Sequence, residues 1–376
     1  EGRAPYAEAE FEGIFFLESY FVGSNVRKPT QEGYADYVPV HLSETQKLIR
    51  SGIHPVDVAM IQVCPPDKHG YVSMGTSVDA TLAAVQNAKT VIAVINPNVP
   101  RAWGDAIIKL SDIDIFCEDD TPLIEAHPAT LTEQDIAIGK NVASLIEDGA
   151  TLQMGIGAIP NAVLSQLGNH KNLGIHTEMF SDGVIDLVEK GVITGKCKTL
   201  HPGKLVATFL MGSQCLYDFV DNNPNVALFP VDYVNDPYVI RQNRQLISIN
   251  SCIEIDLSGQ VCSETIGPKQ FSGTGGQVDY IRGAALSEGG KSILAMPSTA
   301  ARGKVSRIVP YLAAGAAVTT SRNEVDYIVT EYGIAHLKGK TLRQRAESLI
   351  RIAHPDFRES LTEEFFHRFP LALQTI

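Results

Sequence analysis

The sequence predicts an α/β fold made of two related open α/β domains. Apolar strand-like runs alternate with helical patterns and glycine-containing turns along most of the chain, as such folds require. One set of these features also occurs twice, in the same order. With 376 residues, 44% of them hydrophobic, the chain can bury more than one core. We therefore expect one domain at residues 1–140 and a second at residues 141–376.

The internal repeat is most visible at two turns. Asp67 and Gly70 in the first half match Asp256 and Gly259 in the second half at a constant spacing of 189 residues. Loop insertions would explain why the spacing grows further along the chain. The paired features are the apolar runs 58–63 and 246–250, the turns 67–72 and 256–261, the runs 90–97 and 291–297, and the runs 112–118 and 324–331.

A strand–turn–helix–strand unit in the middle of the chain predicts a ligand site. Residues 150–154 and 173–177 are apolar and strand-like, and residues 161–167 between them have a helical pattern. In a parallel sheet the loop after the first strand and the end of the second strand open on one edge, where α/β proteins bind ligands. Glu178 would then face the loop at Gly155, whose backbone N–H groups can bind negative charge.

Neither part of this unit is specific alone. Gly155 and Gly157 are half of a dinucleotide fingerprint, and Pro160 stands where the third glycine should be, so an ordinary tight turn is equally compatible. Most glutamates are solvated surface residues. Glu178 differs because it ends an apolar strand and is followed by a polar turn at 181–183. It is therefore our candidate for a carboxylate nucleophile.

Other ionisable residues are weaker candidates. His69 and His176 could act as acids or bases, but no serine or cysteine nucleophile motif accompanies them, which favours turn and strand-end roles. Glu254 alternates with apolar residues in a strand pattern and could be misread as the nucleophile.

Five motifs spread over the chain carry a family resemblance. They are residues 65–71 (PPDKHGY), 153–160 (QMGIGAIP), 176–183 (HTEMFSDG), 250–261 (NSCIEIDLSGQV) and 273–282 (GTGGQVDYIR). Together they resemble the acetyl-CoA hydrolase/transferase family, most closely its branch of 4-hydroxybutyrate and butyryl-CoA:acetate CoA-transferases. The resemblance implies a CoA-transferase-like tandem repeat, with a further N-terminal segment before residue 1. It also implies that Glu178 is the nucleophile and that Glu254 is not, because Glu254 lies in the family's strand before the turn at 259–261.

The same resemblance implies which residues form the rest of the site. A glycine of the loop at Gly275 and Gly276, which permits close approach of backbone to a ligand, helps to hold the thioester oxygen in the family; a plain flexible loop is the alternative. Asn250 becomes a possible polar partner, and Tyr20 could line the acyl site. The implied CoA contacts are Gln153, Met154, Gly155, Ile156, Gly157, Ile253, Gly275, Gly276 and Lys304.

The expected reaction moves CoA from a short-chain acyl-CoA, such as 4-hydroxybutyryl-CoA or butyryl-CoA, to a carboxylate such as acetate. It would proceed by ping-pong kinetics through a glutamyl-CoA thioester on Glu178. CoA is a substrate moiety, and the mechanism needs no metal or redox cofactor. Two alternatives stay open at this point: an acetyl-CoA hydrolase of the same fold, and a nucleotide-binding dehydrogenase that uses the Gly155 loop.

Charge and composition bear on the partners. A net charge of −12 argues against nucleic acid, and the polyanionic CoA would need a local cationic patch, for which we consider Lys291, Arg302, Lys304 and Arg307. No apolar run is long enough for a membrane span, and we expect a cytoplasmic homodimer. The six cysteines lack metal-ligand spacing, which predicts reduced thiols.

Overall fold

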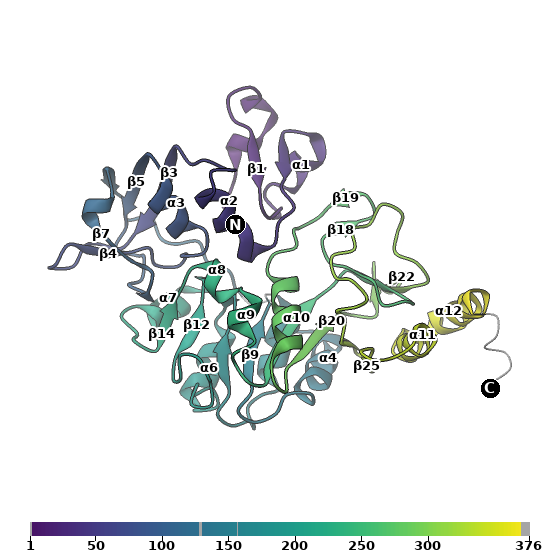
Figure 1. Cartoon of the computed structure of the whole chain (residues 1–376). Coiled ribbons are helices and arrows are strands. Elements are labelled where there is room, and N and C mark those ends of the chain that lie inside the picture. Colours follow the sequence, from purple (N-terminus) through teal and green to yellow (C-terminus); the bar gives the residue numbers. More distant parts are fainter. Residues whose placement is uncertain (1, 128–129, 156, 370–376) are drawn as a thin grey trace.

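The computed structural model describes residues 2–127, 130–155 and 157–369 and shows an α/β fold (Figure 1). Its large sheet has the strand order β25-β24-β20-β15-β9-β10-β12-β14-β6. All neighbouring pairs are parallel except β24 and β25. The strands are β6 (Trp103–Gly104), β9 (Thr151–Met154), β10 (Gly174–His176), β12 (Leu205–Ala207), β14 (Val226–Leu228), β15 (Leu246–Ser251), β20 (Lys291–Ala295), β24 (Tyr327–Thr330) and β25 (Gly333–His336).

Helices cover both faces of this sheet. All residues of β9 and all but the last of β15 are buried, as expected for central strands of a parallel sheet. In Figure 1, α10 (Gln277–Leu286) lies in front of the sheet and α4 (Glu133–Ala143) behind it. The N-terminus of α4 is fixed by a capping box between Thr132 and Asp135. The strand–helix–strand unit of β9, α5 (Ala158–Ser165) and β10 agrees with the sequence prediction.

The predicted repeat is present in the topology. In the first repeat, β3 (Val58–Val63), β5 (Thr90–Ile95) and β8 (Ile115–Glu118) form a parallel sheet in that order. In the second repeat, β15, β20 and β24 follow one another in the same parallel order. The helix between the first two strands is α3 (Thr81–Asn87) in the first repeat and α10 in the second.

The two matching turns have the same hydrogen bonds. The Asp67 carboxylate accepts the backbone N–H of His69 (2.8 Å) and Tyr71 (3.0 Å). The Asp256 carboxylate accepts those of Ser258 (2.8 Å) and Gln260 (3.1 Å). Gly70 and Gly259 have φ of 81° and 93°, a region that favours glycine. The sequence alignment of the two halves is therefore also a structural one.

The predicted domain boundary near residue 140 falls inside α4 and remains a prediction. Strand β6 from the first half joins the large sheet beside β14. One buried apolar cluster also contains residues of both halves, for example Val63 of the first and Leu152 of the second. The two halves therefore share a core, and residues from both can contribute to one site.

An N-terminal arm, residues 17–44, packs against the second half of the chain. Figure 1 shows β1 and α1 (purple) above the top of α10. The Leu42 backbone N–H donates to the carbonyl oxygen of Gly275 (3.1 Å), immediately before α10. Elements of the arm are β1 (Leu17–Ser19), α1 (Arg27–Glu32), β2 (Ala35–Tyr37) and η3 (Leu42–Glu44).

The remaining elements are short or lie at the periphery. No helix among the described residues combines the length and apolar character of a membrane span. The other strands are β4 (Tyr71–Ser73), β7 (Ile107–Lys109), β11 (Met179–Phe180), β13 (Phe209–Leu210), β16 (Glu254–Asp256), β17 (Val261–Cys262), β18 (Thr265–Ile266), β19 (Lys269–Gln270), β21 (Thr299–Ala300), β22 (Val305–Ser306) and β23 (Ile308–Val309). The other helices are η1 (Pro5–Ala7), η2 (Ala9–Phe11), α2 (Thr45–Arg50), η4 (Leu110–Asp112), α6 (Gly183–Glu189), α7 (Gln214–Val220), α8 (Val231–Val234), α9 (Pro237–Ile240), α11 (Leu342–Arg351) and α12 (Pro355–Arg368).

Candidate active site

Glu178 lies between the end of β10 and the start of β11, at the carboxyl edge of the large sheet. Its carbonyl oxygen accepts the backbone N–H groups of Thr208 (2.9 Å) and Phe209 (3.2 Å). The main chain of Glu178 is therefore anchored to the segment where β12 ends and β13 begins. This anchoring fixes the position from which the Glu178 side chain projects. Glu178 as a whole residue is half-buried at this edge of the sheet.

Two groups contact the Glu178 carboxylate directly. The Asn235 side-chain amide donates to Oε2 at 3.0 Å, and the Gly276 backbone lies beside the same oxygen, where its N–H group helps to lower the pKa of the carboxyl group. Gly276 is the residue that precedes α10, so the carboxylate faces the positive end of that helix. A Cβ atom at Gly276 would lie 2.0 Å from Oε2 of Glu178 and 2.2 Å from Nδ2 of Asn235. Only glycine leaves room for this contact.

The environment makes Glu178 an unusual carboxylate. Burial raises the pKa of Glu178 to about 7, and the negative charges of Asp279 and Asp79 add to the increase. The hydrogen bonds from Asn235 and Gly276 act in the opposite direction, because they stabilise the charged form. A carboxylate with a raised pKa is less solvated and more basic, which suits a nucleophile.

A buried support lies beneath Asn235. Both His176 Nε2 (2.9 Å) and the Tyr280 hydroxyl (3.0 Å) contact the carbonyl oxygen of Val234, the residue before Asn235. Burial, with the nearby charge of Lys198, lowers the pKa of His176 to about 3. His176 is thus neutral and engaged with the backbone. This agrees with the predicted strand-end role rather than acid–base chemistry.

The Gly155 loop differs from the expectation in one respect. The Gly155 N–H donates to the carbonyl oxygen of Ile249 (3.0 Å), because β9 and β15 are still paired at this point. The N–H of Gly155 itself is therefore paired within the sheet, and the CoA contacts of the Gly155 loop remain a prediction. Gly157, with φ of 108°, immediately precedes α5 and is exposed. The predicted contact Ile156 lies outside the described residues.

Gln153 and Asn250 form a buried amide cluster with Ser248 across β9 and β15. Asn250 Nδ2 donates to Gln153 Oε1 (3.0 Å), Gln153 Nε2 donates to Asn250 Oδ1 (3.1 Å), and the Ser248 hydroxyl donates to Gln153 Oε1 (2.7 Å). Met154 beside them is also buried. These side chains satisfy one another, so their present arrangement fits a support beneath the Gly155 loop better than direct ligand contact.

The other predicted CoA contacts lie further along the second repeat. Ile253 is half-buried after β15, Gly275 is buried beside Phe21, and Lys304 is exposed in the β21–β22 hairpin. Arg302 is exposed in the same hairpin. Lys291 does not join this group, because it lies at the opposite end of β20 and pairs with Glu147 (2.9 Å).

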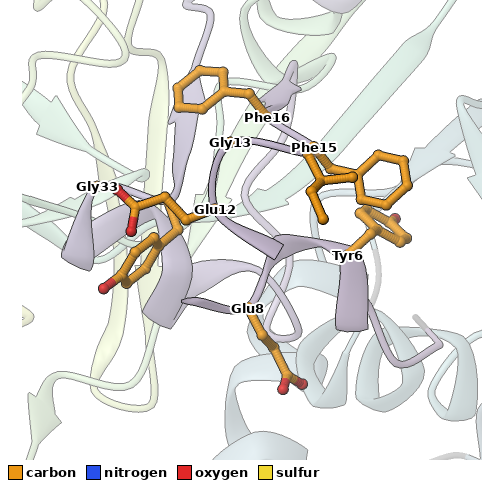
Figure 2. Close-up of a pocket in the computed structure, with 9 residues that line it drawn as sticks. Tyr6, Glu8, Glu12, Gly13, Phe15, Phe16 and Gly33 are labelled. Atoms are coloured by element: carbon orange, nitrogen blue, oxygen red, sulfur yellow. The ribbon is translucent and has the colours of Figure 1, made fainter. Parts of the chain in front are cut away.

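A cavity of about 280 Å³ lies elsewhere, within the first 34 residues (Figure 2). Its described lining includes none of the predicted site residues, so we assign it no part in the chemistry. The lining residues are Tyr6, Glu8, Glu12, Gly13, Ile14, Phe15, Phe16, Gly33 and Tyr34.

The sequence analysis missed Asn235 and Asp279. Asn235 is fully buried and follows the one-turn helix α8, in a segment without a recognisable motif. Only the fold brings it to Glu178. Asp279 lies in the 273–282 motif, three residues after Gly276, and that spacing on a helix could have placed it near the site. Its carboxylate accepts the backbone N–H (3.1 Å) and hydroxyl (2.8 Å) of Ser43 in the N-terminal arm.

Known proteins resemble this chain over nearly its whole length. The model of the acetyl-CoA hydrolase/transferase N-terminal domain matches residues 2–125, and that of the C-terminal domain of the same family matches residues 212–365. A 4-hydroxybutyrate coenzyme A transferase of Clostridium kluyveri is 60% identical over 98% of this chain and 86% of its own length. The chain belongs to the acetyl-CoA hydrolase/transferase family.

Two further members show the breadth of the likeness. A butyryl-CoA:acetate CoA-transferase of Anaerostipes caccae is 40% identical over 93% of this chain and 80% of its own length. The crystal structure of a 4-hydroxybutyrate CoA-transferase from Porphyromonas gingivalis is 46% identical, with a TM-score of 0.82 over 97% of this chain and 91% of that one. The predicted family, α/β fold and CoA-transferase class are therefore confirmed, which sets aside the dehydrogenase alternative.

Proposed function

We propose that this enzyme transfers CoA from a short-chain acyl-CoA to a carboxylic acid such as acetate, with Glu178 as the covalent nucleophile. The observation that carries the proposal is the Glu178 carboxylate, which lies between the Asn235 amide and the Gly276 backbone, in a buried setting that raises its pKa to about 7. The names of the relatives support 4-hydroxybutyryl or butyryl as the acyl group.

The first half-reaction would load CoA onto the enzyme. A Glu178 oxygen attacks the thioester carbonyl carbon, and the tetrahedral oxyanion collapses with cleavage of the C–S bond. This gives an acyl-glutamyl anhydride and a CoA thiolate. The thiolate then attacks the Glu178 carbonyl carbon, the anhydride C–O bond breaks, and the acyl group leaves as its carboxylate. Glu178 is left as a CoA thioester, without net gain or loss of a proton.

The second half-reaction repeats these steps in reverse with the acceptor acid. A carboxylate is a weak nucleophile toward a thioester, so the mechanism depends on positioning, desolvation and oxyanion donors. Gly276 N–H and the α10 N-terminus can supply the donors, and the Asn235 amide orients the attacking oxygen. Every step uses the carboxylate, the thiolate and these donors, so we propose no metal or redox cofactor.

A set of acyl-CoA donors assayed against acetate tests the proposal and the acyl preference together. We expect acetyl-CoA to form at the rate at which the donor is consumed, fastest with a four-carbon donor. CoA release that is equally fast without acetate would favour the acetyl-CoA hydrolase instead.

A further inference from the structure

Glu264 is a buried carboxylate that lies outside the direct contacts of Glu178. Only 7% of its surface is exposed. Among the described residues, no Lys, Arg or His forms an ion pair with it. Its oxygens accept from the Tyr37 hydroxyl (3.1 Å), the Thr319 hydroxyl (2.9 Å), the Thr274 hydroxyl (3.3 Å) and the Gln270 amide (3.3 Å). Burying a carboxylate with neutral donors alone is costly, which makes a purely structural role an expensive one.

Glu264 contacts the glycine loop, residues 271–276, through its main chain and its side chain. The Glu264 carbonyl oxygen accepts the N–H groups of Phe271 (2.8 Å) and Ser272 (3.0 Å). Its carboxylate accepts the Thr274 hydroxyl, and the Thr274 N–H donates to the hydroxyl of Tyr37 (3.3 Å). Both the main chain and the side chain of Glu264 therefore fix this loop.

This loop ends at Gly276, where the position of the backbone is critical. A single additional carbon atom at Gly276 would overlap Glu178 and Asn235. Gly275, with φ of 55°, sets the direction of the chain into α10. A displacement of about 1 Å at a catalytic donor can cost about 100-fold in rate, so whatever fixes the loop also affects catalysis.

Tyr37 makes this arrangement an assembly of two distant parts of the chain. It lies at the end of β2 in the N-terminal arm and joins Glu264 and Thr274 of the second half. Nearby, the Arg27 guanidinium donates to the Phe271 carbonyl oxygen (2.7 Å) and lies over the Phe271 ring. The glycine loop is therefore fixed by Tyr37 and Arg27 of the N-terminal arm and by Glu264 of the second half.

We propose that Glu264 is a positioning residue, whose carboxylate holds Thr274 and Tyr37 so that the Gly276 N–H points at Glu178. The proposal rests on the proposed function, because it needs Glu178 as nucleophile and Gly276 as donor. Glu264 does not touch the reacting atoms. It acts through the shape of the loop.

The test compares Glu264→Gln with a matched control, Asp256→Asn. Asp256 is also buried and also accepts only neutral donors, from Ser258 and Gln260, but its described contacts lie in its own turn and not in the glycine loop. In Glu264→Gln, the new NH₂ group faces hydroxyl and amide donors and disturbs the loop. We measure kcat, KM for the acyl-CoA, the single-turnover rate of enzyme–CoA thioester formation, and Tm.

We expect Glu264→Gln to lower kcat and the rate of thioester formation about 10- to 100-fold, with KM within about 3-fold. Asp256→Asn lowers Tm but keeps kcat within about 2-fold. Wild-type rates of thioester formation in folded Glu264→Gln would overturn the proposal. The proposal would also be overturned if, in both variants, the loss of rate were fully explained by the loss of folded protein.

Tyr37→Phe provides an independent test should the Glu264 variants fail to fold. It removes one hydroxyl and should lower thioester formation about 10-fold, and its effect should not add to that of Glu264→Gln because both act on one loop. Unchanged kinetics in Tyr37→Phe, or full additivity, would count against the proposal. Glu178→Gln distinguishes failure of the proposed function from failure of the role of Glu264. An active Glu178→Gln enzyme would refute the proposed function itself. An inactive Glu178→Gln enzyme together with a Glu264→Gln enzyme of normal activity would refute only the role of Glu264.

Discussion

The side-chain nitrogen of Asn235 lies 3.0 Å from Oε2 of Glu178, although 57 positions separate the two residues in the chain. The same oxygen faces Gly276. The proposed nucleophile thus contacts one side-chain donor and one glycine backbone from different elements. This three-residue contact leads to the following predictions.

Glu178→Gln should retain the fold and lose CoA transfer by at least about three orders of magnitude, because an amide cannot form the glutamyl thioester. Steady-state assays with acyl-CoA and acetate measure the loss, and circular dichroism checks the fold. Glu254→Gln is the control, since Glu254 accepts a backbone N–H from Ala313 (2.8 Å) on another part of the surface. If Glu178→Gln were nearly as active as the wild type, another carboxylate would have to be the nucleophile.

Gly276→Ala should lower kcat at least about 100-fold, because its Cβ would displace the Glu178 carboxylate from its donors. Gly155→Ala is a matched control in the other glycine loop. A Cβ there would meet its nearest atoms only at 3.7 to 3.9 Å, in ordinary contact. Equal rate losses in both variants, measured at equal thermal stability, would contradict the distinction between the two loops.

The rate of thioester formation should rise with pH through about 7, because only ionised Glu178 attacks. Asn235→Ala removes a donor that stabilises the charged form, so the pKa of Glu178 rises further. The rising limb of the pH–rate profile therefore moves to higher pH. Single-turnover rates from pH 5.5 to about 9 would show the shift. Asn243→Ala, another fully buried asparagine, should leave the limb in place. An acid shift in Asn235→Ala would show that the amide does not stabilise the carboxylate.

Incubation with acyl-CoA and no acceptor should leave part of the enzyme heavier by the mass of CoA less water. Borohydride or hydroxylamine should then inactivate the enzyme, but only after acyl-CoA is added, because neither reagent attacks the free carboxylate. Intact-protein mass spectrometry and peptide mapping would locate the adduct on Glu178. An enzyme that turns over acyl-CoA without adduct or inactivation would not use the covalent route.

The sequence predicted the parts of the fold that depend on local pattern. The apolar strands, the glycine turns at Gly70 and Gly259, and the strand that ends at Glu178 all have short-range signals, and the structure contains them. The repeat was also visible, because both copies use the same residues to close the same turn. The side-chain network around Gln153 could not be predicted, since it depends on the pairing of β9 with β15.

The contacts of the nucleophile were predictable only in part. Gly276 could be proposed because a glycine pair is a conspicuous signal for close backbone approach. Asn235 could not, because a single asparagine after a one-turn helix has many ordinary roles in turns. The pairing of the Gly155 N–H with Ile249 could not be predicted either, because the sequence does not show where strand pairing stops.

The bond from the Tyr37 hydroxyl to the Glu264 carboxylate spans 227 positions of the chain. Contacts between such distant positions form late, because a long loop must close before they bring any gain. The local strands and helices can therefore be complete before the Tyr37–Glu264 hydrogen bond fixes the glycine loop. A refolding enzyme should regain its circular dichroism first and its activity afterwards, with the arm docking as the step that starts turnover.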